Sequence, residues 1–511
     1  MSVFSSASPD DTIFRKKSVD DVIHQNDPEG QRESSSPGLR KKLGMWDLVG
    51  VGIGMVIGTG IFTLTGIEAK NHAGPAVVIS FFVAGIVAML AAVCYAELAS
   101  AVPTAGSAYT YAYVTVGEVF AWIIAWDLIL EFALGASVVA RGWSGYLGNL
   151  FDLWPQWFGE SSTVNVGAIV ITVVLGVIAA LGIQESKTVT NILVLIKVTV
   201  CIFVIALGIW FVRVENWIPF VPKSQPMPAN NRLGGLAQPL WQAVSGIQPN
   251  VFGVSGILMA TAVVFFSYSG FELMANMGEE ARNPGKDMPR AILIVLALCT
   301  LLYMGVSLVV TGMVHYSKLD EGAPIADAFK QMGVGWASGL IALAALCGLT
   351  SVILIDIVGM GRIFFAMSRD GLLPPKVGQV NERTRTPLAV TGVVTVAIAL
   401  ISGFIPLAEL ADMVSIGTLF AFLVVAIAVA ILRKTQPELK RPFMVPLSPW
   451  LPVFSAIACL LLMCSLSVMT WIRFVVWLAI GLVIYGFYGR RHSRVHRARL
   501  AEQNGVAGED A

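Results

Sequence analysis

Charged side chains are scarce in this chain of 511 residues, and their scarcity excludes most soluble folds. Asp, Glu, Lys and Arg make up only 13% of the sequence, whereas soluble domains usually carry about 25%. Hydrophobic residues make up 56%, and the mean hydropathy is +0.74. The net charge of +1 provides no field that would attract nucleic acid or a charged partner protein. The composition therefore predicts that a lipid bilayer is the solvent for most of the chain.

Side chains that serve catalysis and metal binding are also rare. The five histidines, at 24, 72, 315, 492 and 496, lie outside the centres of the apolar stretches, and no HExxH, P-loop or GxSxG motif is present. The six cysteines lie inside apolar stretches without a CxxC pair, which is typical of small buried side chains rather than of a disulfide framework. We therefore expect no enzyme activity, no bound metal and no cofactor.

Apolar stretches follow a polar N-terminal segment and continue almost to the end of the chain. Residues 1–42 are predicted to be a disordered tail without a signal peptide. The later stretches are about 20 residues long, which is the length that spans a bilayer. They predict an all-α polytopic membrane protein with twelve transmembrane helices. The predicted spans are 47–68, 75–100, 116–140, 166–184, 189–212, 253–277, 289–314, 336–366, 387–404, 409–432, 449–468 and 471–488.

A proline-rich loop at 213–251 divides these spans into two blocks. It separates five helices at 43–212 from five more at 252–432. A block of five spans has odd parity, so a repeated second block would be upside down, as in transporters built from inverted repeats. Two further helices are expected at 433–489, followed by a basic tail at 490–511.

Lys and Arg are concentrated in one set of loops, which includes the tail at 490–499. Because such loops face the cytoplasm, we expect both termini on the cytoplasmic side of the plasma membrane and the 213–251 loop outside. The basic tail either contacts anionic membrane lipids or simply flanks the last helix. The sequence does not determine the oligomeric state.

The first span contains five glycines within eleven residues, from Gly50 to Gly60. Each glycine weakens a helix by about 1 kcal/mol relative to alanine. The run therefore predicts an unwound point, where the free N–H groups of the following half-helix form an anion site. A substrate carboxylate is the expected guest. The alternative is close helix packing, because Gly50, Gly54 and Gly58 are spaced as GxxxG.

The sixth span has a similar interruption at the matching position of the second block. It reads FFSYSGFE at 265–272, where small polar residues and a glycine interrupt an apolar run. Interrupted helices at matching positions in two halves indicate a transporter binding site. Unwound carbonyl groups here could accept hydrogen bonds from a substrate ammonium. The alternative is that these residues are polar side chains of an ordinary packed helix.

Several charged residues are expected at membrane depth. Lys197 lies in the fifth span, where it either loads and releases a proton or extends to the lipid head groups. Asp127 and Glu131 share one face of the third span, where an acid could meet a cationic substrate, pair with a fixed base or line a wet vestibule. In the eighth span Asp356 and Arg362 are expected to be structural partners or gate elements. Glu279 and Glu280 end the sixth span as a possible gate or a solvated pair.

Nine motifs distributed between Leu43 and Ser493 occur together in this sequence. They are GMVIGTGIF at 54–62, HAGPAVVISF at 72–81, CYAELASAVPTAGSAYTY at 94–111, WDLILE at 126–131, NILVLIK at 191–197, FFSYSGFE at 265–272, EEARNPGKDMPRAI at 279–292, RIFFAMSRDGLLP at 362–374 and RPFMVPLSPWLP at 441–452. With these motifs the sequence resembles the amino acid–polyamine–organocation (APC) superfamily, most closely its cationic amino acid transporter branch, in a bacterial-type form.

The resemblance implies a LeuT-like fold of five plus five inverted helices with two extra helices, in which helices 1 and 6 are broken. It implies that the substrate carboxylate binds at Ile57, Gly58, Thr59 and Gly60, and the amine at Phe266, Ser267 and Ser269. It also implies proton coupling at Lys197, which matches the fifth-span lysine of bacterial members. Ser267 departs from the FFAY pattern that is usual at this position. Ile353 and Glu131 are candidates for side-chain specificity, and the apolar Ile353 argues against a cationic substrate.

These observations lead to one hypothesis of transport with several alternatives. The chain is expected to import neutral or broad-range L-amino acids together with protons by alternating access, so its partners are free amino acids, protons and membrane lipids. The transport alternatives are an amino acid/amine exchanger and a cationic amino acid permease. The alternative from another class is a membrane amino acid sensor. A channel is disfavoured because no selectivity filter or ring of like charges is evident.

Overall fold

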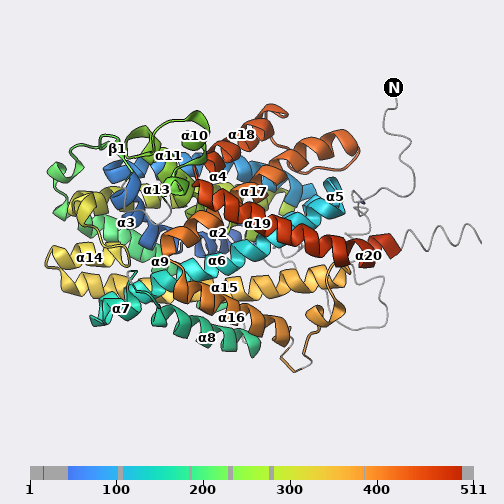
Figure 1. Cartoon of the computed structure of the whole chain (residues 1–511), viewed down its shortest axis with the longest axis horizontal. Helices are drawn as coiled ribbons and strands as arrows, with labels where there is room; N and C mark the ends of the chain where they lie inside the picture. Colours follow the sequence, from blue (N-terminus) through green and yellow to red (C-terminus); the bar gives the residue numbers. More distant parts are fainter. Residues whose placement is uncertain are drawn as a thin grey trace, which may run out of the picture.

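The computed structural model describes residues 15, 44–101, 107–160, 162–182, 187–227, 234–275, 281–381, 383–384 and 386–497. Within these residues the chain is mainly helical (Figure 1). The helices of at least eight residues are α2 (Met45–Val56), α4 (Val77–Ala101), α5 (Ser107–Thr115), α6 (Glu118–Phe151), α8 (Val166–Ala180), α9 (Lys187–Gly208), α11 (Gly253–Val264), α13 (Pro284–Met313), α14 (Pro324–Gln331), α15 (Gly335–Arg369), α16 (Leu388–Phe404), α17 (Leu407–Thr435), α18 (Trp450–Cys464) and α19 (Val468–Ile484).

Long apolar helices confirm a polytopic membrane protein. In the described part of the chain, eight helical stretches are long and apolar enough to cross a membrane, and four shorter apolar helices accompany them. Each predicted span coincides with one of these stretches, apart from the first two. There α2 stops at Val56, and the helical turns that follow run on from Gly60 into α4. The count of twelve spans stays a prediction, because α2, α8, α16 and α18 are shorter than a span usually is.

The helices that surround the centre form two packed groups. One group contains α2, α4, α11 and α13, together with the short helix α12 (Phe271–Ala275). The other contains α6, α8, α15 and α16, and Figure 1 shows α6 and α15 running side by side along the molecule. Helix α9 packs against α2, α13 and α15, and α17 packs against α4 and α6. A site between the two groups is therefore lined by helices of both groups.

The predicted loop at 213–251 has a small structure of its own. Strands β1 (Gln225–Pro226) and β2 (Asn250–Val251) pair antiparallel, and the short helix α10 (Leu240–Ser245) lies between them in the sequence. The Gln242 side chain holds this segment together, because it donates to the Asn250 and Ser255 side chains. The described part of the loop is therefore folded rather than an open linker.

A buried carboxylate joins α4 to the segment between α17 and α18. Glu97 is 1% exposed and accepts hydrogen bonds from Arg433 Nε at 2.9 Å, Arg433 Nη2 at 2.5 Å and the backbone N–H of Val445 at 2.6 Å. A fork-shaped guanidinium that binds both oxygens gives strength and direction to the contact. This contact fixes the end of α4 relative to the end of α17.

The first prediction concerns this ion pair. Arg433→Met removes the charged hydrogen bonds to Glu97 but leaves Arg441 Nε 3.6 Å from the carboxylate, so the variant is expected to destabilise the fold by about 1.5–3 kcal/mol. Arg473→Met is the matched control, because Arg473 and Glu409 form a half-exposed pair worth only about 0–1 kcal/mol. Thermal unfolding of both variants in detergent micelles checks this. Equal unfolding temperatures for the two variants would contradict it.

Candidate functional site

The first helix of the membrane region is interrupted after Val56. Helix α2 ends there, Ile57 is extended with φ −75° and ψ 102°, and helical backbone resumes at Thr59. The chain then continues as helical turns through η2 (Gly60–Leu64), α3 (Thr65–Glu68) and η3 (Ala69–Ala73). The glycine-rich sequence explains the interruption, because glycines give the helix little intrinsic stability. The first N–H groups after the interruption have no partner within their own helix.

The sixth predicted span is interrupted in a different way. Helix α11 ends at Val264 and is followed by the tight turn η8 (Phe265–Tyr268). Ser269 is then extended, and Gly270 has φ 109°, a conformation that side chains other than glycine rarely adopt. Both interruptions predicted from the sequence are therefore present in the structure.

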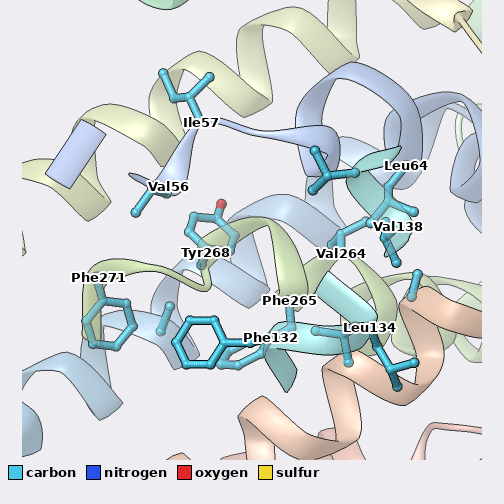
Figure 2. Close-up of a cluster of buried hydrophobic side chains, with 14 of the residues drawn as sticks. Val56, Ile57, Leu64, Phe132, Leu134, Val138, Val264, Phe265, Tyr268 and Phe271 are labelled. Carbon is cyan, nitrogen blue, oxygen red and sulfur yellow. The ribbon is translucent and has the colours of Figure 1, made fainter. Parts of the chain in front are cut away.

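The two interruptions lie against each other. A Cβ atom added to Gly60 would lie 2.5 Å from the Cα atom of Ser267, and one added to Gly270 would lie 3.0 Å from the carbonyl oxygen of Met55. Figure 2 shows Val56 and Ile57 on one segment and Tyr268 on the other, with Ile57 pointing away from the second segment. Close packing through glycine and interruption of the helices therefore occur together, so the two interpretations of the glycines are not exclusive.

Tyr303 of α13 joins the two interrupted segments. Its hydroxyl oxygen lies 2.8 Å from the carbonyl oxygen of Val56 and 3.0 Å from that of Ser267, so its one hydrogen can be donated to either. Tyr303 is fully buried. Backbone groups that leave a helix inside a membrane must find partners in the protein, and Tyr303 provides one. No pattern in the sequence identified this tyrosine.

A small cavity of about 50 Å³ lies where the two interruptions meet α6 and α15. The polar atoms Thr59 Oγ1, Ser267 Oγ and Glu131 Oε2 are buried without a hydrogen-bond partner among the described residues. Unpaired buried polar atoms around one cavity indicate a site for a polar ligand. The lining residues are Met55, Val56, Gly58, Thr59, Gly60, Glu131, Phe132, Gly135, Val139, Phe266, Ser267, Ser269, Gly270, Glu272, Leu273, Val352, Ile355 and Asp356.

Glu131 connects the cavity to three structural elements. It lies on α6, and its Oε1 atom accepts hydrogen bonds from the Ser269 hydroxyl at 3.0 Å and the Thr418 hydroxyl at 2.8 Å. Ser269 belongs to the second interruption and Thr418 to α17. Glu131 therefore positions the second interruption with one oxygen, while the other remains available to a ligand.

Two further acids line the cavity. Both oxygens of Glu272 accept from the backbone N–H of Gly270 at 2.9 Å, so this acid caps the start of α12. Asp356 lies within 3.4 Å of the position that a Cβ atom on Gly135 would occupy, so it faces α6. The expected partnership of Asp356 with Arg362 is wrong, because Arg362 is exposed and six residues along a helix place it on another face.

Most, but not all, of the other predicted site residues line the cavity. Gly58, Thr59, Gly60, Phe266, Ser267 and Ser269 line the cavity, whereas Ile57 and Ile353 do not. Ile353 is fully buried in packing, and its neighbour Val352 faces the cavity instead, because successive helical residues are turned by about 100°. The argument against a cationic substrate that used Ile353 therefore loses its structural basis. Glu279 and Glu280 lie outside the described residues.

Lys197 of α9 is buried, with 1% of its surface exposed. Its Nζ atom donates to the carbonyl oxygen of Gly54 in α2 at 2.7 Å, and its side chain packs against Gly348 of α15. This position contradicts the alternative in which the lysine extends to the lipid head groups. The lysine lies beside the cavity rather than in it, and Met55 and Ile355 line both the central cavity and the small space at Lys197.

The second prediction concerns the contact between the interruptions. Gly60→Ala would place a Cβ atom against the backbone of Ser267 and is expected to destabilise the protein by about 1–3 kcal/mol. Gly50→Ala is the matched control, because a Cβ atom at Gly50 meets nothing within 4 Å and alanine favours a helix by about 1 kcal/mol. Unfolding temperatures should shift in opposite directions. A neutral Gly60→Ala would show that the two segments do not touch.

Comparison with known proteins places this arrangement in a family. A family model described as amino acid permease matches residues 43–487. The Methylthioribose transporter of Bacillus subtilis (strain 168) is 40% identical over 95% of this chain and 100% of its own length. The Branched-chain amino acid permease BcaP of the same organism is 39% identical over 95% and 99%. The vacuolar Cationic amino acid transporter 4 of Arabidopsis thaliana is 37% identical over 84% and 68%.

These relatives are named as transporters and permeases, which confirms the expectation that the protein is not an enzyme. The family match covers all the spans that surround the cavity. The chain belongs to the amino acid permease family of the APC superfamily.

Proposed function

We propose that this protein is a secondary active transporter that carries L-amino acids into the cell by alternating access, driven by an inward proton gradient. The observation that carries the proposal is the cavity between the two interrupted helices, which α6 and α15 close from the other side. A substrate held where half-helices meet can be reached from either side of the membrane when one set of helices tilts against the other.

The proposed substrate pose follows from the chemistry of the two interruptions. The carboxylate binds the backbone N–H groups at Gly58, Thr59 and Gly60, where a half-helix begins with positive partial charge. The Ile57 N–H is not part of this pose, because it donates to the carbonyl oxygen of Ile53. The ammonium binds carbonyl and hydroxyl oxygens at Phe266, Ser267 and Ser269. The contact between Gly60 and Ser267 supports this pose, because it brings the two sets of groups within the length of one amino acid backbone.

The finer description of the fold is part of the same proposal. We propose twelve spans in a LeuT-like five plus five inverted repeat, with both termini cytoplasmic and Glu279 and Glu280 at the cytoplasmic gate. The grouping of helices supports the repeat, because the first two spans of each block, α2 with α4 and α11–α12 with α13, share one packed group. The next two spans of each block, α6 with α8 and α15 with α16, share the other.

Lys197 is the proposed proton-coupling group. In this structure it donates to the carbonyl oxygen of Gly54, three residues before the interruption at Ile57. A charged ammonium makes a hydrogen bond about twice as strong as a neutral amine does, so protonation strengthens the hold on α2 and loss of the proton weakens it. A difference in proton affinity between the two states is what allows a proton gradient to bias them.

The third prediction tests this role. Lys197→Gln keeps a donor but cannot change charge, so accumulation driven by a pH gradient is expected to fall to the level of facilitated exchange in proteoliposomes. Counterflow of labelled substrate should persist, because the cavity is intact. Lys318→Gln, at an exposed lysine, is the control and should accumulate like the wild type. Unchanged accumulation by Lys197→Gln would remove the lysine from the coupling mechanism.

The side-chain end of the cavity supports a neutral or broad range of substrates. Phe132, Val139, Val352 and Ile355 form an apolar wall there, and such a wall suits aliphatic side chains. A relative over nearly the whole chain is named as a branched-chain amino acid permease. A cationic amino acid permease is the second candidate, because the acids Glu131 and Asp356 line the same space.

The fourth prediction separates these candidates. Uptake of leucine, lysine, arginine and glutamate is measured in proteoliposomes with and without an inward proton gradient, for the wild type and Glu131→Gln. If the substrate is cationic, Glu131→Gln should reduce lysine and arginine uptake about tenfold or more, since a buried charge contact is worth about 1.5–3 kcal/mol. If the substrate is neutral, leucine uptake should exceed lysine uptake in the wild type.

The same experiment tests the proposal as a whole. Counterflow without net uptake would identify an exchanger. Binding of amino acids without uptake or counterflow would identify a sensor and overturn the proposal of transport.

A further inference from the structure

Asp127 is a buried acid that the proposed transport site does not use. It precedes Glu131 on α6 by four residues, so it lies one helical turn, about 6 Å, away on the same face. From Glu131 to Asp127 the helix runs away from the cavity, toward the start of α6 at Glu118. This is the end of the molecule where α5 and α20 (Arg490–His492) lie (Figure 1). At that end Glu118 accepts hydrogen bonds from Tyr485 and Ser493.

The carboxyl group of Asp127 is enclosed without compensation. It is 0% exposed, and neither oxygen has a hydrogen-bond partner or an ion pair among the described residues. Across from it, α17 presents Gly417, whose added Cβ atom would lie 3.0 Å from Asp127 Oδ1, so α17 offers neither donor nor charge at that point. The space beside Asp127 is therefore shaped by a glycine and holds no fixed base.

The titratable groups around Asp127 are acids and tyrosines. Glu131 lies on the same helix, and Tyr95 of α4 interacts electrostatically with Asp127, Glu131 and Glu272. The hydroxyl groups of Tyr95 and of Tyr111 in α5 are also buried without a partner, and the two rings pack edge to face with centroids 6.4 Å apart. Asp127 therefore lies in a buried region of acids and hydroxyl groups that contains no base among the described residues.

The surroundings of Asp127 disfavour the ionised carboxylate. An unpaired buried charge loses its hydration without a compensating partner, and neighbouring negative charges add to the penalty. A neutral carboxylic acid loses far less, and it can donate its own hydrogen. The buried position without fixed partners therefore favours the neutral, protonated acid over the carboxylate.

We propose that Asp127 is a second proton-binding site of the transport cycle, separate from Lys197. Asp127 holds its proton while the cavity is closed. When the path toward the α20 end opens, water reaches the carboxyl group, the O–H bond breaks, and the proton passes to that water. The carboxylate takes a proton again before the path closes.

The role of Asp127 in the transport cycle rests on the proposed function, whereas the presence of a proton on Asp127 does not depend on that function. Lys197 lies on α9 beside α2, and Asp127 lies on α6 beside α17. The two sites therefore face different helices, so proton exchange at one site does not require the other site to be open.

The first measurement tests the proton itself. Infrared difference spectra of membranes at neutral pH compare the wild type with Asp127→Asn, which keeps the shape of the side chain. A carboxylic acid C=O band should disappear in Asp127→Asn and shift in Asp127→Glu, which also shows that a carboxyl at this position folds. Asp152→Asn is the control, because Asp152 is largely exposed in an ion pair with Lys330 and contributes no such band. A spectrum without a lost band would overturn the proposal.

The second measurement tests the role in transport. Uptake into oriented proteoliposomes is measured at constant external pH while the pH on the α20 side is lowered. Wild-type uptake should fall, approaching about tenfold per pH unit, the limit for release of one proton, whereas Asp127→Asn should change less than about twofold. In a parallel series at constant pH on the α20 side, Lys197→Gln is expected to lose the response of uptake to external pH instead. Absence of wild-type uptake would count against the proposed function alone and leave the infrared result to decide; an Asp127→Asn response equal to that of the wild type would overturn the second site.

Discussion

The structure depends on one constraint, which is that a helix interrupted inside a membrane must have its backbone groups satisfied by protein or by a ligand. Two interruptions are placed against each other, at Gly60 with Ser267 and at Gly270 with Met55. Tyr303 bridges a carbonyl oxygen of each. What the protein leaves unsatisfied faces a common cavity. Either interruption alone would leave backbone groups without partners inside the membrane. Where the two meet, the groups that remain without partners form a polar site between them.

The two groups of surrounding helices contribute different parts of this site. The group of α6, α8, α15 and α16 provides a continuous helical wall, and its acids Glu131 and Asp356 face the cavity. The group that contains α2, α11 and α12 carries the interruptions and therefore the weaker hydrogen bonding. Lys197 and Tyr303 reach the interrupted segments from α9 and α13. Polar side chains thus connect stable helices to the segments whose conformation is least stable by itself.

Several acidic side chains are buried in the interior of the protein. In the cavity Glu272 is held by the backbone at the start of α12, and Glu131 is held by Ser269 and Thr418. Asp127, one turn further along α6, has no such partners among the described residues. Acids of similar depth therefore differ in their fixed hydrogen bonds, and that difference separates a residue that positions a segment from one that is suited to hold a proton.

The sequence by itself determined the membrane class, the position of nearly every helix and both interruptions. These follow from local properties, because apolar length, glycine content and small polar residues act within one helix. It also placed Lys197 at membrane depth. Only the tertiary structure decided that Lys197 turns to Gly54 rather than to lipid, that Asp356 faces the cavity rather than Arg362, and that Val352 lines the site in place of Ile353. A position along a helix gives the direction of a side chain, but the neighbour it meets comes from a helix far away in the chain, and no local pattern encodes that neighbour.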